Sequence, residues 1–183
     1  MSEKEIPHIH KALIKAAKRN NRKAQSELYE LYYKAIYNCC LRIVNNTFVA
    51  EDLMHDSFIE SFKNINQFNE SATFGAWLKK IAINKSINYL KREKLIAHKL
   101  EHYSSIEEDE NSETNLSIKE VKMALEQLPT NYRLVFSLYL IEGYDHEEIG
   151  SILNISKSTS RSQLSRAKKE VKRVLEQQKY STT

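Results

Sequence analysis

The residues with the clearest chemical signature lie at 144–170, where the sequence reads YDHEEIGSILNISKSTSRSQLSRAKKE. The first part of this stretch is acidic, the last part is basic, and serines cluster between them. Arginine reaches guanine edges or phosphates, and small serine side chains let a helix approach base edges closely. The stretch therefore predicts a helix that binds duplex DNA.

Two helices joined by a tight turn are expected to position these side chains. Asp145, with Glu148 three residues later, forms a capping-box pattern that starts the first helix. Asn154 tolerates the left-handed backbone that the turn requires, and Ser156 can cap the second helix. At about 100° per residue, the second helix turns one seam toward the rest of its domain, formed by Leu164, Ala167, Val171 and Val174.

The opposite surface of this second helix carries the candidate contacts to DNA. Small side chains lie near its start, and cations continue beyond them. The alternative is an ordinary solvated basic face on a helical bundle. The candidate residues are Lys157, Ser158, Arg161, Ser162, Ser165, Arg166, Lys169 and Arg173.

Composition predicts an all-α protein without catalytic machinery. The 183 residues include only three Gly and two Pro, too few for many hairpins. The sequence contains no phosphate-binding loop, zinc-protease motif or nucleophile elbow, so we expect no enzyme activity, cofactor or metal. It has no apolar run long enough to span a bilayer and no signal-peptide core, which predicts a cytoplasmic protein without membrane insertion. Cys39 and Cys40 are expected to be reduced thiols in or near the core.

Charge divides the chain into three parts. Residues 1–99 carry a net charge of +7, and residues 100–118 carry −6 without a single Lys or Arg. Residues 119–155 carry −3, and residues 156–183 carry +6. We therefore predict two small helical domains, 1–99 and 119–183, joined by an acidic flexible linker at 100–118.

Hydrophobic spacing predicts four helices in the first domain and two before residue 144 in the second. The expected helices of the first domain span about 7–19, 23–44, 47–65 and from Ser71 or Thr73 to beyond 90. The second of these should bury Ala24, Leu28, Leu31, Ala35 and Cys39. The second domain should contain helices at 118–128 and 131–142, the latter buried nearly all round through Leu134, Val135, Phe136, Leu138, Leu140 and Ile141.

Two further surfaces of the first domain could bind partners. Amides and cations share about a quarter turn of the fourth helix, where Trp77 could stack on an unpaired base or belong to the core. An acidic series on the third helix lies beside Leu53 and suggests a cationic protein partner, although it could equally be a solvated face. The first surface comprises Trp77, Lys80, Asn84, Asn88 and Lys91, and the second Asp52, Leu53, Asp56 and Glu60.

Two long segments resemble the sigma-70 family of bacterial RNA polymerase sigma factors. The segment AEDLMHDSFIESFKNINQFNESATFGAWLKKIAINKSINYLKREK is similar to region 2 of the extracytoplasmic-function (ECF) class. The segment LEQLPTNYRLVFSLYLIEGYDHEEIGSILNISKSTSRSQLSRAKKEVKRVL is similar to region 4, with its helix-turn-helix. The resemblance covers roughly residues 20–95 and 120–175, in the order that the family has.

This resemblance implies a division of labour between the domains. Region 2 would bind the polymerase clamp helices and the promoter −10 element, with Phe68, Asn69 and Ser71 in the loop that captures a flipped base. Region 4 would bind the −35 element and the polymerase flap. The family also implies an anti-sigma partner. The chain departs from the family pattern at two positions of the second helix. Ser160 stands in the seam where an apolar residue is usual, which suggests looser packing. Gln163 replaces a common Arg, which puts one contact to a phosphate or base in doubt.

The sequence thus predicts an alternative-type sigma factor that directs promoter-specific initiation. A free-standing helix-turn-helix regulator is the first alternative, because it would carry the same DNA-binding helix. A helical adaptor whose basic faces bind acidic proteins is the second, and it would bind DNA without a steep salt dependence.

Overall fold

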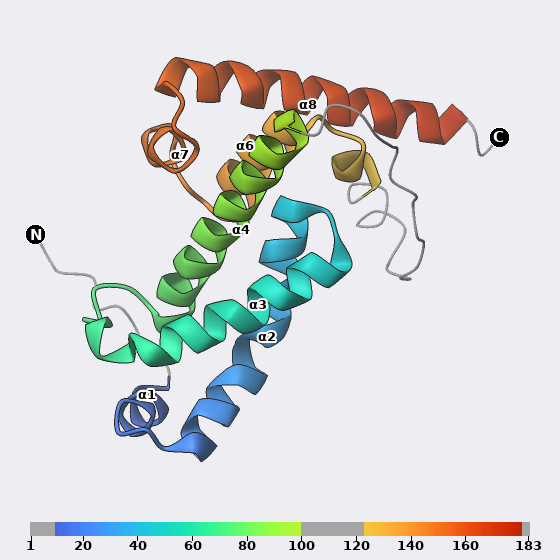
Figure 1. The fold of residues 1–183 in the computed structure, drawn as a ribbon. Helices are drawn as coiled ribbons and strands as arrows, with labels where there is room; N and C mark the ends of the chain where they lie inside the picture. Colours follow the sequence, from blue (N-terminus) through green and yellow to red (C-terminus); the bar gives the residue numbers. More distant parts are fainter. Residues whose placement is uncertain (1–9, 100–122, 181–183) are drawn as a thin grey trace, which may run out of the picture. The chain divides into compact units, whose positions relative to one another are not determined.

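The computed structural model describes residues 10–99 and 123–180, and all of their regular structure is helical (Figure 1). The chain divides into two compact units, Met1–Lys94 and Leu95–Thr183. The acidic linker expected at 100–118 lies outside the described residues. Within the described ranges, no helix has the length and apolarity needed to cross a membrane.

The first unit contains the four expected helices and one 3₁₀ turn. They are α1 (Lys11–Ala17), α2 (Arg22–Val44), α3 (Thr47–Lys63), η1 (Ile65–Gln67) and α4 (Phe74–Lys99). Residues 7–9 of the expected helix 7–19 lie outside the described residues, and α1 covers Lys11–Ala17 of the rest. His10 precedes it with a left-handed φ of 75°, which a right-handed helix cannot include.

Short polar side chains set the boundaries of α2, α3 and α4. Asn45 ends α2 with a left-handed φ of 53°, and Asn46 begins α3 by accepting a hydrogen bond from the Val49 amide at 3.0 Å. These two residues confirm the predicted break. At the start of α4, Thr73 Oγ1 accepts a hydrogen bond from the first turn at 3.2 Å. Ser71, the other expected cap, bonds to Asn69 instead.

The buried face of α2 differs from the predicted stripe. Leu28 and Cys39 are buried as expected, but Leu31 is 50% exposed and Ala35 is exposed. The helix packs against both α1 and α3, and its buried residues do not follow a single stripe along its length. The residues that complete the α2 core are Ile36, Cys40, Ile43 and Val44.

After residue 122, the described part of the second unit starts with one helical turn at 123–126. It continues through α6 (Thr130–Phe136), the π-helical segment η2 (Ser137–Ile141), α7 (His146–Leu153) and α8 (Lys157–Tyr180). The part of the expected helix 118–128 before residue 123 lies outside the described residues.

The expected helix 131–142 is not regular throughout. At its end, the Glu142 amide donates to the carbonyl of Ser137, five residues earlier, at 3.0 Å. Leu140 and Ile141 are 46% and 44% exposed, so the expectation of burial nearly all round is wrong at this end. The π-helical widening changes the direction in which these side chains leave the axis. Gly143 then ends the segment with a φ of 80°.

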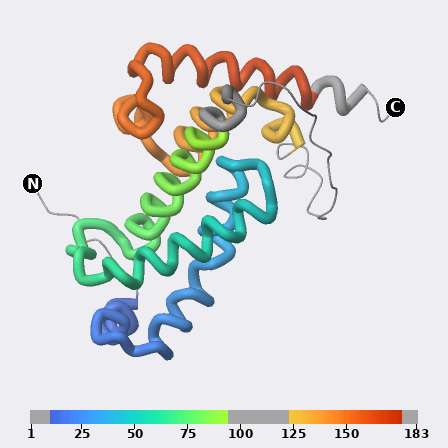
Figure 2. The backbone as a smooth tube through the Cα atoms, viewed as in Figure 1, coloured from blue at the N-terminus to red at the C-terminus, as the bar shows by residue number. Residues whose placement is uncertain are grey.

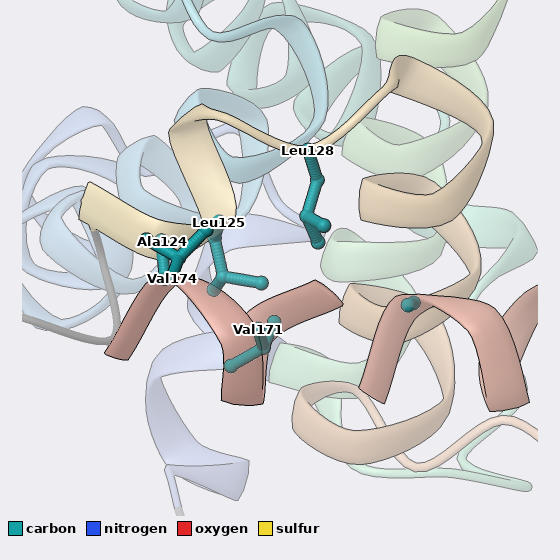
Figure 3. Close-up of a cluster of buried hydrophobic side chains, with 6 residues drawn as sticks. Ala124, Leu125, Leu128, Val171 and Val174 are labelled. Carbon is teal, nitrogen blue, oxygen red and sulfur yellow. The ribbon is translucent and has the colours of Figure 1, made fainter. Parts of the chain in front are cut away.

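The core of the second unit confirms the predicted seam of α8. Figure 3 shows Ala124 and Leu125 facing Val171 and Val174 of α8, with Leu128 nearby. Ala167, fully buried, belongs to the same cluster. Every residue of the predicted seam is at most 8% exposed. Burial of this seam fixes which side of α8 faces solvent.

Candidate nucleic-acid interface

The helix α7 begins with a complete capping box at Asp145. Its Oδ1 accepts hydrogen bonds from the amides of Glu147 and Glu148 at 2.7 and 2.9 Å. Glu148 Oε2 in turn accepts from the Asp145 amide at 2.8 Å. The backbone hydrogen bonds hold the pKa of Asp145 below its ordinary value. The predicted start of the helix-turn-helix is therefore confirmed.

The turn between α7 and α8 is tight (Figure 2). Asn154 has the expected left-handed backbone, with φ 57° and ψ 51°. The Ile155 amide donates to the Gly150 carbonyl at 3.0 Å. A Cβ added at Gly150 would lie 2.8 Å from the Ile155 carbonyl oxygen, so the turn needs a residue without a side chain here. Ser156 Oγ then accepts from the Thr159 amide at 3.0 Å and caps α8.

All eight candidate DNA contacts on α8 are exposed. Two of the cations also have carboxylate neighbours, because Lys157 forms an ion pair with Glu147 and Arg173 forms one with Glu170. The Arg173 pair lowers the pKa of Glu170. Arg161 and its neighbours thus form an accessible polar face on the side opposite the buried seam.

The inner side of α8 contains the polar residue Ser160, which was expected from the sequence to be loosely packed. Ser160 is fully buried, and its Oγ lies 2.9 Å from Nδ1 of His146 on α7. A hydrogen bond between α7 and α8 therefore lies in the seam, at a position where an apolar contact was expected. The sequence did not reveal this pair, because its members are fourteen positions apart in a stretch dominated by the capping and charge signals.

In the first unit, α4 presents the expected polar strip. Lys80, Asn84, Asn88 and Lys91 are all exposed. Trp77 is half-buried, and its ring centroid lies 5.4 Å from that of Phe68 and 5.7 Å from that of Phe74. The indole therefore belongs to an aromatic cluster while retaining some exposed surface.

The candidate residues in the loop before α4 differ in exposure. Phe68 is only 2% exposed, so in this structure its ring is not accessible for the expected contact with a flipped base. Its ring packs in the aromatic cluster, and its carbonyl accepts a hydrogen bond from Lys18 Nζ at 2.8 Å. Asn69 and Ser71 are exposed and bond to each other at 2.7 Å. Between them Glu70 has a left-handed φ of 60°, so the loop is tightly turned.

The acidic series on α3 has an intramolecular cation that the sequence did not reveal. Lys85 Nζ, on α4, lies 2.9 Å from Glu60 and 4.0 Å from Asp56. Asp52 and Asp56 are exposed, and Leu53 is half-buried. Sequence spacing gave no signal for Lys85, since α4 is apolar around much of its circumference.

Three exposed apolar side chains of α2 and α3 were also missed. Leu31, Phe48 and Ile59 are 50%, 78% and 52% exposed. Helical spacing had placed Leu31 in the buried stripe of α2. These side chains and the acids leave the α2–α3 part of the first unit with both apolar and anionic surface.

Comparisons with known proteins agree with the division into two units. The family Sigma-70 region 2 matches residues 28–96, and Sigma-70, region 4 matches residues 118–171. The chain is 30% identical over 179 residues to the ECF RNA polymerase sigma factor SigW of Bacillus subtilis (strain 168), which covers 90% of this chain and 96% of the relative. It is 29% identical over 150 residues to SigM of the same organism, covering 80% and 91% of the two chains.

Solved structures share the fold. The sigma factor RpoE in complex with the anti-sigma factor NepR, from Bartonella quintana, superposes with a TM-score of 0.60 at 19% identity, covering 82% of this chain and 96% of that one. CnrH in complex with the cytosolic domain of CnrY gives 0.56 at 22% identity, covering 90% and 96%. With both regions matched in order and a relative covered almost end to end, the chain belongs to the ECF sigma factors of RNA polymerase, within the sigma-70 family.

Proposed function

We propose that this chain binds core RNA polymerase and directs it to promoters by binding their −35 and −10 elements with separate units. The exposed face of α8, opposite a fully buried seam, is the observation that carries the −35 assignment. Arg161, Arg166 and Lys169 would contact bases or phosphates in the major groove. Ser158, Ser162 and Ser165 are small enough to allow close approach of the helix.

The first unit would bind the −10 element with α4 and the loop that precedes it. Lys80 and Lys91 would contact phosphates, and Asn84 and Asn88 would hydrogen bond to base edges or the backbone. Asn69 and Ser71 lie in the exposed part of the loop, where a flipped base could be bound. Phe68 would shape this loop from within. Trapping unpaired bases would favour strand separation, with no enzymatic step.

The polymerase would bind the acidic series Asp52, Asp56 and Glu60 together with Leu53. Carboxylates on one helix face attract a cationic surface, and the sigma family binds the clamp helices of the largest polymerase subunit. The second unit would contact the polymerase flap. One similar fold, RpoE, is in complex with the anti-sigma factor NepR, and we propose the same kind of regulator and a cytoplasmic location for this chain.

A reconstituted transcription assay tests the proposal. Core polymerase mixed with this chain should produce run-off transcripts from a subset of candidate promoters, and core polymerase alone should not. Failure of the chain to bind core polymerase would contradict the proposal. Tight, sequence-specific binding of the isolated chain to DNA, unchanged by polymerase, would instead identify a free-standing regulator.

A further inference from the structure

The contact between His146 and Ser160 joins the two helices of the helix-turn-helix at one defined point. Ser160 is the fourth residue of α8 and comes directly before the exposed Arg161. Its hydroxyl is 2.9 Å from His146 Nδ1 and is shielded from solvent. Because a hydrogen bond is directional, this contact limits rotation and sliding of α8 against α7 more narrowly than an apolar contact would.

The imidazole is itself held by a second element. The ring of His146 stacks on Tyr139 of the π-helical segment η2, with centroids 4.5 Å apart and planes 22° from parallel. A chain of contacts therefore runs from η2 through His146 to the start of α8. The ion pair between Lys157 and Glu147 ties the first residue of α8 to α7 as well, but at an exposed position.

We propose that His146 is a positioning residue that fixes the placement of α8 and thereby sharpens discrimination among −35 sequences. This inference rests on the proposed function, in which α8 reads the −35 element. The direct contacts come from Arg161 and its neighbours, whereas His146 acts through Ser160. A small rotation of α8 would carry Arg161 away from a base edge while leaving its charge close to the phosphates, so sequence discrimination would fall more than general affinity.

The electrostatic setting agrees with a neutral imidazole in this role. Partial burial and the nearby cations Arg161, Lys157 and Lys168 lower the pKa of His146, and only the adjacent Asp145 opposes them. A neutral ring offers one nitrogen as an acceptor or donor to the Ser160 hydroxyl without adding a further cation beneath the DNA-binding face.

The test uses holoenzyme reconstituted from core polymerase and the full chain, with a promoter library randomised over the −35 element. Sequencing of the bound fraction gives a matched and an unmatched promoter, and the ratio of their dissociation constants measures discrimination. His146→Phe keeps a ring for Tyr139 but loses Nδ1, and Ser160→Ala removes the hydroxyl. Each should lower the ratio about three- to tenfold, the range expected for one lost hydrogen bond. The double variant should lose no more than either single variant.

Two further variants separate positioning from folding. His146→Asn retains a polar atom near the place of Nδ1 and should restore part of the discrimination that His146→Phe loses. Ser151→Ala removes a hydroxyl that bonds to the Glu147 carbonyl at 3.1 Å on the exposed side of α7, and it should leave the ratio unchanged.

The possible outcomes distinguish this inference from the proposed function. An unchanged ratio in His146→Phe or Ser160→Ala overturns the inference. So does an equal loss on matched and unmatched promoters, or additive losses in the double variant. If the wild-type holoenzyme showed no −35 preference at all, the proposed function itself would fail.

Discussion

The two helices proposed to face DNA, α4 and α8, are oriented by different means. The helix α8 has one narrow seam on its inner side, and its opposite face is wholly polar. The helix α4 is buried on a broader arc, where Leu78, Ala82, Ile83, Ser86 and Ile87 are all at most 4% exposed. The amides and lysines of the polar strip are among its exposed residues. A one-sided seam thus identifies the solvent-exposed face of α8 from spacing alone, whereas the exposed face of α4 depends on its neighbours in the bundle.

The two helices also differ in how their cations are arranged. Lys157 and Arg173 of α8 pair with carboxylates close in sequence or on the adjacent helix, and both remain exposed. Lys85 of α4 instead reaches across to α3, and its side chain is 26% exposed. The ion pair partly neutralises this cation of α4, and the same lysine offsets part of the acidic series on α3.

The largest expected effect concerns the packing of α4. Leu78 is fully buried, and Leu78→Ala should lower the free energy of unfolding of the first unit by about 2–5 kcal/mol, through lost burial and a cavity. Urea titration followed by fluorescence of Trp77, the single Trp of the chain, reports on this unit. The matched variant Leu31→Ala changes a half-exposed residue and should cost no more than about 0.5 kcal/mol. Equal losses in the free energy of unfolding for the two variants would show that the buried side chains of α4 are not its main source of stability.

The next effect concerns the polar face of α8. Arg161→Ala should weaken holoenzyme binding to a matched −35 element by about 1–3 kcal/mol if Arg161 reads a base. Filter binding on matched and scrambled −35 elements would measure the loss. An equal loss on both would make Arg161 a phosphate contact. Arg173→Ala, whose guanidinium pairs with Glu170, should lose less than Arg161→Ala, and the reverse order would contradict the assignment of the outer face.

A smaller effect should follow from removing the cation that links α4 to α3. Lys85→Met should change the free energy of unfolding by less than about 1 kcal/mol, because a partly exposed ion pair contributes little. It should strengthen binding of core polymerase at low salt, since Glu60 and Asp56 would carry uncompensated charge. Surface-immobilised core polymerase would measure this. Lys80→Met is the charge-matched control and is expected to leave polymerase affinity unchanged. A decrease in polymerase affinity for Lys85→Met would contradict the idea that Lys85 competes with the polymerase for the acidic series.

The smallest effect is a pH dependence of the second unit. The folded state lowers the pKa of His146, so the unfolded chain binds the proton more readily. The stability that this provides is complete above the ordinary histidine pKa of 6.5 and falls as the pH decreases through that value. Between about pH 8 and pH 5.5, melting temperature should fall more for the wild type than for His146→Phe. Parallel pH profiles would show that His146 does not contribute.

Local signals explain why the helix-turn-helix could be predicted nearly residue by residue. Asp145, Asn154 and Ser156 each act on backbone groups within three or four positions, so their roles follow from residue type and spacing. The four apolar residues of the α8 seam follow one another at helical spacing. Both regions, their order and the solvent-facing side of α8 could therefore be inferred before the structure was known.

The features that escaped prediction depend on contacts between distant residues. Leu31 fits a buried stripe by spacing, yet α1 and α3 cover other parts of α2. Phe68 lies in a polar loop, and its ring packs against Phe74 and Trp77 of α4. The pair His146–Ser160 and the partner of Lys85 likewise require two helices to be placed together. The π-helical segment η2 has no local sequence signature of the kind that marks a cap or a turn.

The burial of Cys39 and Cys40, which are 1% and 0% exposed, has a practical consequence. Both thiols of the chain are shielded from maleimide reagents in the folded state, so engineered surface cysteines would be modified selectively. One fluorophore on each unit, for instance through Ser151→Cys and Ser26→Cys, would allow energy transfer to follow the separation of the units. The measurement could be made on the chain alone, with an anti-sigma factor added, and with core polymerase added.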